Sequence, residues 1–286
     1  MRNLYCVVML LCAFNCFGQE REIAITIDDL PLVASKMDTP ANQQRATERF
    51  TSIVQAFAEN KVPATGFVIA GAIGKGQTAF LQQFLDAGLS LGNHTYSHYN
   101  LNQKSAGKYI ADIDRADKIL TPLLTTPKYF RYPYLAEGNK KTKPLVQEYL
   151  AEHQYTIAPV TIDSKDFAFN EQLYKIPFRS RVAYIEKFKS RYLAFIWKQT
   201  LLAEKKANGK PVKQILLIHA NLLNSYLLKD VIQMYKQNGY TFISLAQALE
   251  NPAPTITAPD VQTNEKTVIN KIVSNVIPEG QPAEVQ

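Results

Sequence analysis

The segment IAITIDDLP, residues 23–31, is a short run of β-favouring residues that ends in two adjacent carboxylates and a proline. The run is typical of a buried strand, and Pro31 ends it because proline cannot donate to a sheet ladder. Two neighbouring aspartates at the end of a buried strand cost free energy unless a cation lies beside them. Asp28 and Asp29 therefore indicate either a metal site or, more simply, a helix-capping Asp with a solvated neighbour.

The composition is that of an ordinary globular protein with a large core: 286 residues, 46% hydrophobic and 20% charged. The formal net charge of +7 is spread along the sequence. No dense basic block with interleaved aromatic residues is present, so nucleic acid is not expected as a partner. A solvated basic face is the simpler interpretation of this charge, and attraction to an anionic cell-wall glycan is the alternative.

Residues 1–18 have the pattern of an export signal. Arg2 precedes a short apolar core at 6–14, which is too short to span a bilayer, and small residues precede an expected cleavage site near Gly18. We expect an exported periplasmic or cell-surface protein without a transmembrane segment; a lipoprotein attached through Cys16 is the alternative. All three cysteines lie in this segment, so no disulfide and no thiolate chemistry is expected in the mature protein.

Strands and helices are predicted to alternate from residue 22 to about residue 250. The predicted strands are 22–28, 62–69, 89–91, 128–131, 155–162, 213–218 and 241–244. The predicted helices are 42–60, 77–87, 106–120, 143–153, 180–206 and 225–237. This alternation predicts an α/β fold with a parallel sheet and right-handed crossovers, and closure into a barrel is favoured over an open sheet.

The expected domain organisation follows from these patterns. Residues 1–18 form the signal peptide and residues 19–250 a single catalytic domain. From Asn251 to residue 286 the chain becomes polar and rich in proline, so this tail is expected to be peripheral or disordered.

The polar residues that could carry chemistry follow the predicted strands at their carboxyl ends. They are Asp28, Asp29, His94, His98, Arg131, Asp163, Asp166 and His219. In a strand–helix barrel these ends meet on one face, which is where the active site is found. We therefore expect these side chains to form one site.

His94 and His98 are four residues apart, one helical turn, which lets both imidazoles face one ion. Two histidines and one aspartate, with open positions for water, suit zinc or a similar divalent ion. Because this spacing alone is a weak signal, a structural pair is the alternative.

Simpler interpretations also exist for the other polar residues. His219 could be a core histidine whose ring nitrogens are simply hydrogen-bonded, because it ends a buried strand. Arg131 could be a structural ion-pair partner, and Asp163 or Asp166 could cap the segment that follows.

Five ordered segments resemble the motifs of the polysaccharide deacetylases, which share the NodB homology domain and form carbohydrate esterase family four. They are TIDD at 26–29, HTYSH at 94–98, RYPY at 131–134, DSKDF at 163–167 and LIH at 217–219. The resemblance covers about residues 22–250. It implies a distorted (β/α)7 barrel, which agrees with the number of predicted strands.

The resemblance implies a metal site with a base beside it. Asp29, His94 and His98 would hold a divalent ion, for which we expect zinc, with cobalt or nickel as alternatives. Asp28 would be the general base that takes a proton from the attacking water. Arg131 would pair with Asp28 and orient it.

The resemblance also implies an acid and a pocket. His219, tuned by Asp166, would be the general acid toward the leaving amine or alcohol. Tyr134, Phe167 and Leu217 would shape a pocket for the acetyl methyl group.

Three positions depart from the family pattern. Leu30 and Leu135 stand where glycine is common, and Phe167 stands where tryptophan is usual. None of these residues is a metal ligand or a proton-transfer group. We expect all three to line the cleft and to affect the choice of substrate.

The expected function is that of a metal-dependent hydrolase that removes N-acetyl or O-acetyl groups from a carbohydrate, such as a cell-envelope glycan or oligosaccharide. One alternative is a hydrolase of another non-peptide C–N bond in a small molecule. The other is a non-catalytic glycan-binding protein on the same fold. Asp28 and His219 argue against the second alternative, because binding alone needs neither an acid nor a base.

Overall fold

The computed structural model describes residues 20–32, 37–210 and 212–257. The expected signal peptide, residues 1–18, and most of the expected tail lie outside the described residues.

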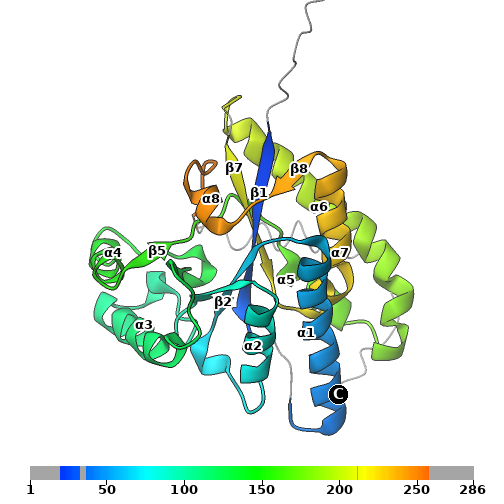
Figure 1. Cartoon of the computed structure of the whole chain (residues 1–286), viewed down its shortest axis with the longest axis horizontal. Helices are drawn as coiled ribbons and strands as arrows, with labels where there is room; N and C mark the ends of the chain where they lie inside the picture. The colour runs from blue at the N-terminus through cyan, green and yellow to red at the C-terminus, as the bar shows by residue number, and fades with distance from the viewer. Residues whose placement is uncertain (1–19, 33–36, 211, 258–286) are drawn as a thin grey trace, which may run out of the picture.

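Strands and helices alternate through the chain (Figure 1). The strands are β1 (Arg21–Leu30), β2 (Ala64–Val68), β3 (Ser90–Asn93), β4 (Lys128–Phe130), β5 (Tyr155–Ile157), β6 (Ile162–Asp163), β7 (Lys213–His219) and β8 (Tyr240–Phe242). The α-helices are α1 (Pro40–Asn60), α2 (Thr78–Asp86), α3 (Ala106–Leu120), α4 (Lys143–Glu152), α5 (Asp166–Tyr174), α6 (Arg181–Lys206), α7 (Leu222–Gln237) and α8 (Leu245–Leu249). Short 3-10 helices are η1 (Ala70–Ala72), η2 (Leu101–Gln103), η3 (Pro133–Leu135) and η4 (Phe178–Ser180).

One parallel sheet organises the molecule, with the order β5-β4-β3-β2-β1-β7-β6 and β8 paired with β1 outside this path. The first strand lies at its centre, where Ile27 is aligned with Gly66 of β2 and Ile218 of β7. The start of β1 pairs with β8, and the ladder between β1 and β2 shifts register between Ile27 and Leu30. In Figure 1, β1 (blue) runs through the middle of the molecule, and its carboxyl end is the lower one.

The predicted α/β barrel is confirmed, in the form of a curled, incomplete barrel with helices around it. The segment predicted as one strand, 155–162, forms two strands, β5 and β6, which lie at opposite ends of the sheet order. Pro159 lies between them and cannot donate to a ladder, which explains the break. No ladder joins β5 to β6 in the described chain, so the barrel is open there.

Both faces of β1 are buried, which explains its almost continuous apolar sequence. Ile23, Ile25 and Ile27 belong to the main core cluster, together with side chains of α1 such as Phe50 and Phe57. Ala24 faces the other way, into a smaller cluster with Phe67, Tyr129 and Ile215.

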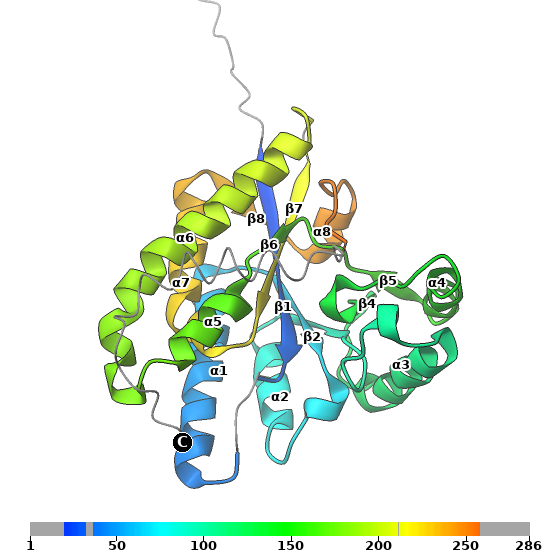
Figure 2. The same cartoon turned by 180° about the vertical axis from the view of Figure 1, so that it is seen from behind.

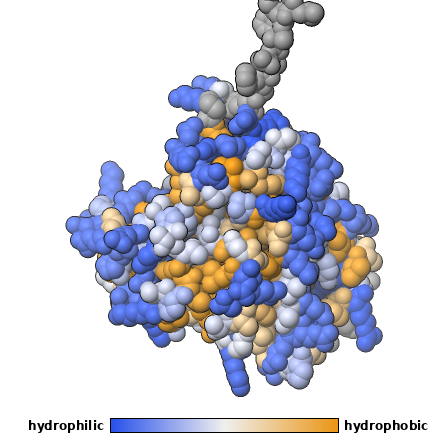
Figure 3. Space-filling view, in the orientation of Figure 1, coloured by the Kyte–Doolittle hydropathy of each residue, from blue (hydrophilic) through white to orange (hydrophobic). Residues whose placement is uncertain are grey.

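The helices surround the sheet on both sides of β1. Figure 2 shows α5, α6 and α7 on one side, and α3 and α4 on the other. In the view of Figure 3, hydrophilic residues cover most of the outer edge of the molecule. None of the helices in the described ranges is both long and apolar enough to cross a membrane.

The first part of the expected tail packs against the barrel. The backbone of Lys213 bonds to both Asn251 and Ala253, and Ile256 forms a bridge with Val160. Ala253 is buried. The packed domain therefore extends a few residues past the expected boundary at residue 250.

Candidate metal and catalytic site

The structure brings the predicted site residues together at the carboxyl ends of the strands. Asp28 and Asp29 lie near the carboxyl end of β1, His94 follows β3, Arg131 follows β4 and His219 ends β7. Asp28 and His219 are aligned partners on the adjacent strands β1 and β7. Aligned residues of neighbouring strands project to the same side of a sheet, so these two side chains share one face.

Three candidate metal ligands converge on one point. The Oδ1 atom of Asp29 lies 3.5 Å from Nε2 of His94 and 3.3 Å from Nε2 of His98. The ligand atoms of the three residues all lie within 4.8 Å of one another. Asp29 Oδ1 is buried and accepts no hydrogen bond from the described residues. A buried carboxylate oxygen without a donor is costly, and a cation held between these three groups would satisfy it.

Both imidazoles favour the neutral form that a metal ligand requires. Burial lowers the pKa of His94 to about 4, and burial together with neighbouring His94 lowers the pKa of His98 to about 4. Nδ1 of His94 lies 2.8 Å from the carbonyl oxygen of Arg131 and must donate to it, which leaves the Nε2 lone pair directed at Asp29. The donor set therefore fits zinc or a similar ion.

The two histidines do not lie on a helical turn, as their spacing had suggested. Thr95 and His98 have φ values of 67° and 54°, in the left-handed region, so the segment is a tight turn after β3. The turn still brings the two rings to a centroid distance of 5.0 Å. The predicted convergence of the histidines is thus found, but by a different local structure.

Asp28 and Arg131 form a buried pair. Their exposed fractions are 3% and 1%, and Nη1 of Arg131 lies 3.5 Å from both carboxylate oxygens of Asp28. Arg131 also donates to the carbonyl oxygen of Ala158 at 2.6 Å and to Oγ1 of Thr26 at 3.1 Å. Burial raises the pKa of the Asp28 carboxyl, and the charge of Arg131 opposes that rise. Such a carboxylate accepts a proton more readily than an exposed one.

Asp166 holds His219 at two points. Its carboxylate accepts hydrogen bonds from the His219 backbone amide at 2.7 Å and from Nδ1 at 2.6 Å. The side-chain amides of Asn221 and Asn224 donate to the same carboxylate, at 2.8 and 2.5 Å. Burial alone lowers the pKa of His219, but the charge and hydrogen bond of Asp166 raise it to about 10. His219 is therefore protonated at neutral pH and can act as an acid.

Two of the predicted pocket residues are exposed beside the site. The Tyr134 ring lies 4.6 Å from the His98 ring and is 52% exposed, and the Phe167 ring lies 6.1 Å from the His219 ring. Leu217 lies two residues before His219 on β7 and is almost fully buried.

The expectation that Leu30 lines the cleft is wrong. Leu30 is fully buried in the main core, where its side chain packs against Gly66 and fills the space that a Cβ atom would occupy there. Leu135 is partly buried and has a φ of 54°, a backbone conformation that favours glycine. This explains physically why glycine is common there in the family pattern.

The alternatives left open for the aspartates are resolved by their hydrogen bonds. Asp163 accepts the backbone amide of Lys165 at 2.9 Å and pairs with its ammonium group at 2.9 Å, so it stabilises the turn before α5. Asp166 is the first residue of α5 and is directed at His219.

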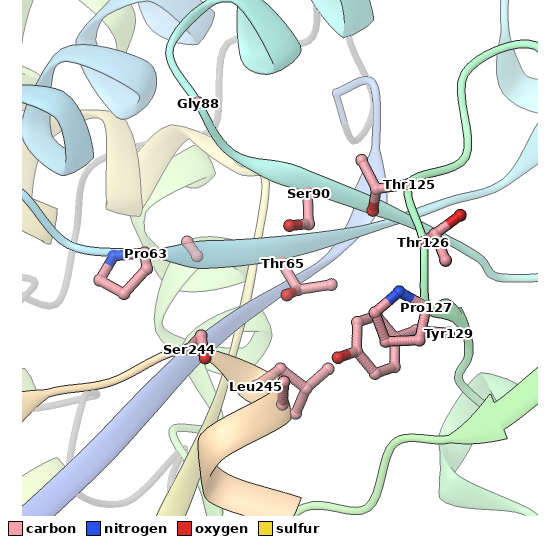
Figure 4. A pocket seen from close by; sticks show the side chains of 12 residues that line it. Pro63, Thr65, Gly88, Ser90, Thr125, Thr126, Pro127, Tyr129, Ser244 and Leu245 are labelled. Carbon is pink, nitrogen blue, oxygen red and sulfur yellow. The ribbon is translucent and has the colours of Figure 1, made fainter.

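A small pocket lies at the other end of the barrel, at the amino ends of β2, β3 and β4. Its volume is about 190 Å³. Figure 4 shows the hydroxyl groups of Thr65, Ser90 and Ser244 around it, beside Leu245 at the start of α8. No histidine and no charged residue is among its described lining residues, so it offers no imidazole or carboxylate.

The polysaccharide deacetylase family model matches residues 18–157. The chain carries a polysaccharide deacetylase domain. The matched part of this deacetylase domain includes Asp28, Asp29, His94, His98 and Arg131. Asp166 and His219 lie beyond it, and the structure joins them to the same site.

Two curated relatives of the deacetylase domain come from Arthroderma benhamiae. A chitin deacetylase is 29% identical over 119 residues, which is 40% of this chain and 31% of the relative. A probable peptidoglycan-N-acetylglucosamine deacetylase is 27% identical over 150 residues, which is 51% of this chain and 30% of the relative. The chain thus spans less than a third of each relative's length.

Solved structures share the fold of the deacetylase domain. A polysaccharide deacetylase from Bacillus cereus matches with a TM-score of 0.58 at 17% identity, over 79% of this chain and 92% of that one. A family 4 carbohydrate esterase from Streptomyces lividans in complex with acetate has a TM-score of 0.52 at 17% identity, over 85% and 100%. A CE4 family pseudoenzyme from Bacillus anthracis has a TM-score of 0.56 at 18% identity, over 80% and 66%.

Sequence reasoning missed several residues that support the site of the deacetylase domain. Thr26 bonds to Arg131, and Asn221 and Asn224 bond to Asp166. One signal was available for Asn224, because it interrupts an otherwise apolar face of α7 and is buried there. A buried polar residue needs a partner, and such a partner is often functional.

Proposed function

We propose that this protein is a metal-dependent hydrolase that removes an N-acetyl or O-acetyl group from a carbohydrate. The observation that carries the proposal is the buried Asp29 oxygen, which has no hydrogen-bond donor and faces the two neutral imidazoles of His94 and His98. A divalent ion held by these residues would lower the pKa of a water and polarise the acetyl carbonyl.

Asp28 is the proposed general base. Its buried carboxylate lies 3.7 Å from His94 Nε2, beside the candidate metal ligands, so a water bound there would be within its reach. The ion pair with Arg131 favours the ionised carboxylate and fixes its orientation, whereas burial raises the pKa of the Asp28 carboxyl. Asp28 would take the proton of the water that attacks the acetyl carbon.

His219 is the proposed general acid. Nδ1 is bonded to Asp166, so the ring has its Nε2–H free to reach the leaving atom. Donation of this proton to the leaving nitrogen or oxygen completes the cleavage. Asp166 stabilises the charged imidazole before the transfer and keeps the ring oriented.

An acetylated glycan is the proposed substrate class. The names of the two fungal relatives, a deacetylase of chitin and a probable deacetylase of peptidoglycan, support an amino-sugar polymer. The exposed rings of Tyr134 and Phe167 offer apolar surfaces beside the site, on which a sugar or an acetyl methyl group can pack. The signal-like pattern of residues 1–18 supports action on a cell-envelope glycan outside the cytoplasm.

The test is acetate release by the purified protein with zinc or cobalt. The substrates are chitin oligomers, peptidoglycan fragments and acetylated xylan, and Asp28→Asn is the control because it keeps the shape of the side chain. Acetate release that Asp28→Asn abolishes is the expected result, and the best substrate distinguishes amide from ester cleavage.

If the metal-bound protein releases no acetate from any of these substrates, the proposal is overturned. That result would favour a hydrolase of another small-molecule C–N bond, or a binding protein without turnover. A pseudoenzyme is among the structural neighbours, so a binding protein without turnover is an outcome that this test must be able to detect.

A further inference from the structure

The two candidate histidine ligands are held in place in different ways. The His94 amide donates to Val68 at 2.9 Å, and its Nδ1 to Arg131 at 2.8 Å; its side chain is only 2% exposed. The His98 side chain is 22% exposed, and no hydrogen bond of its Nδ1 is found in the described part of the chain. The ring of His98 rests against Tyr134. The position of His98 therefore depends mainly on the backbone turn that carries it.

This turn is unfavourable in isolation. Thr95 and His98 have left-handed φ values, which β-branched and bulky residues rarely adopt. Two hydrogen bonds within the segment stabilise it: the Thr95 amide donates to Oδ1 of Asn93 at 2.7 Å, and the His98 amide donates to Oγ1 of Thr95 at 3.0 Å. The amides of Tyr96 and Ser97 remain to be satisfied.

Asp112 accepts both of these amides. Its Oδ2 lies 3.1 Å from the Tyr96 nitrogen and 2.9 Å from the Ser97 nitrogen. Asp112 is 7% exposed and lies on the buried face of α3, next to the core residue Ile113. A buried aspartate on an apolar helix face is costly unless it is hydrogen-bonded, and among the described residues Asp112 makes these two charge-assisted bonds.

The same turn is held at two more points. The guanidinium of Arg115, also on α3, lies 3.5 Å from the centre of the Tyr96 ring and donates to its hydroxyl at 2.8 Å. On the opposite side, the Ala70 and Gly71 amides of η1 donate to the carbonyl oxygens of Thr95 and Tyr96 at 3.0 and 2.9 Å. The turn is thus held between η1 and α3, and Asp112 is the group that binds its backbone amides.

We propose that Asp112 is a positioning residue for the metal site. It fixes His98 against Asp29 by holding the amides of Tyr96 and Ser97, and it touches neither the metal nor the substrate. This inference rests on the metal site proposed above. Loss of the carboxylate would leave two donors of the turn poorly paired and free the His98 ring to move away from Asp29.

The experiment measures zinc affinity of the metal-free full chain by competition with a chromophoric chelator. Asp112→Asn keeps the shape of the side chain but removes its charge and one acceptor. It is expected to weaken zinc binding by roughly 10–100-fold, the usual effect of losing a group that orients a ligand. The absorption spectrum of the cobalt-loaded variant should also change, because the geometry of one ligand changes.

The matched control is Ile113→Val. Ile113 is the next residue on α3 and fully buried, and its aliphatic side chain cannot hydrogen-bond to the turn. This change destabilises the helix packing and should leave zinc affinity and the cobalt spectrum unchanged. Asp112→Glu, which retains a carboxylate, is expected to bind zinc more tightly than Asp112→Asn.

The outcomes separate this inference from the proposed function. If the parent protein binds no zinc, the proposed metal site fails. If the parent binds zinc and Asp112→Asn binds it equally well, or loses no more affinity than Ile113→Val, the positioning role is overturned. Should Asp112→Asn not fold, Arg115→Ala tests the same support of the turn at an exposed position; unchanged zinc affinity in that variant would also overturn the role.

Discussion

Asp166 bonds to His219 through both the backbone amide, at 2.7 Å, and the ring Nδ1, at 2.6 Å. One carboxylate thus fixes the end of β7 and the orientation of the imidazole that it carries. The folded-state pKa of His219, about 10, lies above the value of 6.5 for a free histidine. The stability that this interaction contributes is therefore fully present below pH 6.5 and is lost as the pH rises through about 10.

Asp166→Asn should move the alkaline limb of the activity profile to lower pH. Without the negative charge, the pKa of His219 falls, so the acid loses its proton at a lower pH. The measurement is kcat/KM for acetate release as a function of pH. Asp114→Asn is the control and should leave the limb in place, because Asp114 is a half-exposed residue of α3 whose one ion pair among the described residues is with Lys118. An unchanged limb in Asp166→Asn would contradict the role given to Asp166.

His94→Ala and His219→Ala should have different effects on metal retention. His94→Ala removes a ligand and should abolish zinc retention. His219→Ala should retain zinc and lose activity by roughly 10²–10⁴-fold, the usual contribution of a general acid. Metal analysis after gel filtration, together with acetate release, checks both. Equal metal loss in the two variants would show that His219 belongs to the metal site.

The metal-free protein should lose stability as the pH falls from about 6.5 to 4. The pKa of His94 is about 4 in the folded state because burial favours the neutral ring, so protons bind more strongly to the unfolded chain. His94 alone should contribute about 3 kcal/mol to this loss, since one pKa unit corresponds to about 1.4 kcal/mol. Urea unfolding at several pH values measures it. His94→Gln should show a weaker pH dependence than the parent; an equal dependence would refute the assignment.

Gly71→Ala should destabilise the protein and weaken zinc binding. A Cβ atom at Gly71 would lie 2.5 Å from the carbonyl oxygen of Tyr96, a backbone atom that cannot move without shifting the turn of His98. Overpacking of this kind costs roughly 1–3 kcal/mol. Gly107→Ala on α3 is the matched control: its Cβ would meet nothing within 4 Å, so this change should be neutral or stabilising. Thermal unfolding and chelator competition compare the two.

Arg131→Ala should be strongly destabilising. It leaves the buried carboxylate of Asp28 without its cation and removes the bond to Ala158. Loss of one partner of a buried pair costs roughly 3–5 kcal/mol. Arg21→Ala, which breaks a half-exposed pair with Glu204, should cost about 1 kcal/mol or less. Denaturant unfolding at pH 7 measures both, and similar losses would contradict the central role of Arg131.

The overall fold and the position of the site in it could be predicted from the sequence, because both depend on local patterns. Alternating apolar strands and amphipathic helices predict a parallel barrel, and polar residues after strands predict one active face. The break between β5 and β6 has a local signal in Pro159, but the partners of two short strands depend on the rest of the sheet.

The details of the site depend on contacts between distant segments, which spacing does not reveal. The separation of His94 and His98 suggested a helical turn. Bonds to Asn93 and Asp112 instead stabilise a tight turn in which Thr95 and His98 have left-handed φ values. Leu30 was expected in the cleft from its place beside Asp29. The turn at Asp29, with φ of 63°, directs Leu30 into the core instead.

The alignment of β1 with β7 has a consequence for the order in which the chain can fold. Ile27 finds its partner Ile218 only after most of the domain has been made, and Asp28 meets His219 in the same ladder. A nascent chain that ends before residue 213 has a first strand paired on one side only, and one apolar edge of it remains uncovered. Contacts so far apart in sequence form slowly. Synthesis up to residue 212 therefore yields neither a finished sheet nor a working pair of proton-transfer groups, and both arise together when the segment from residue 213 onward joins.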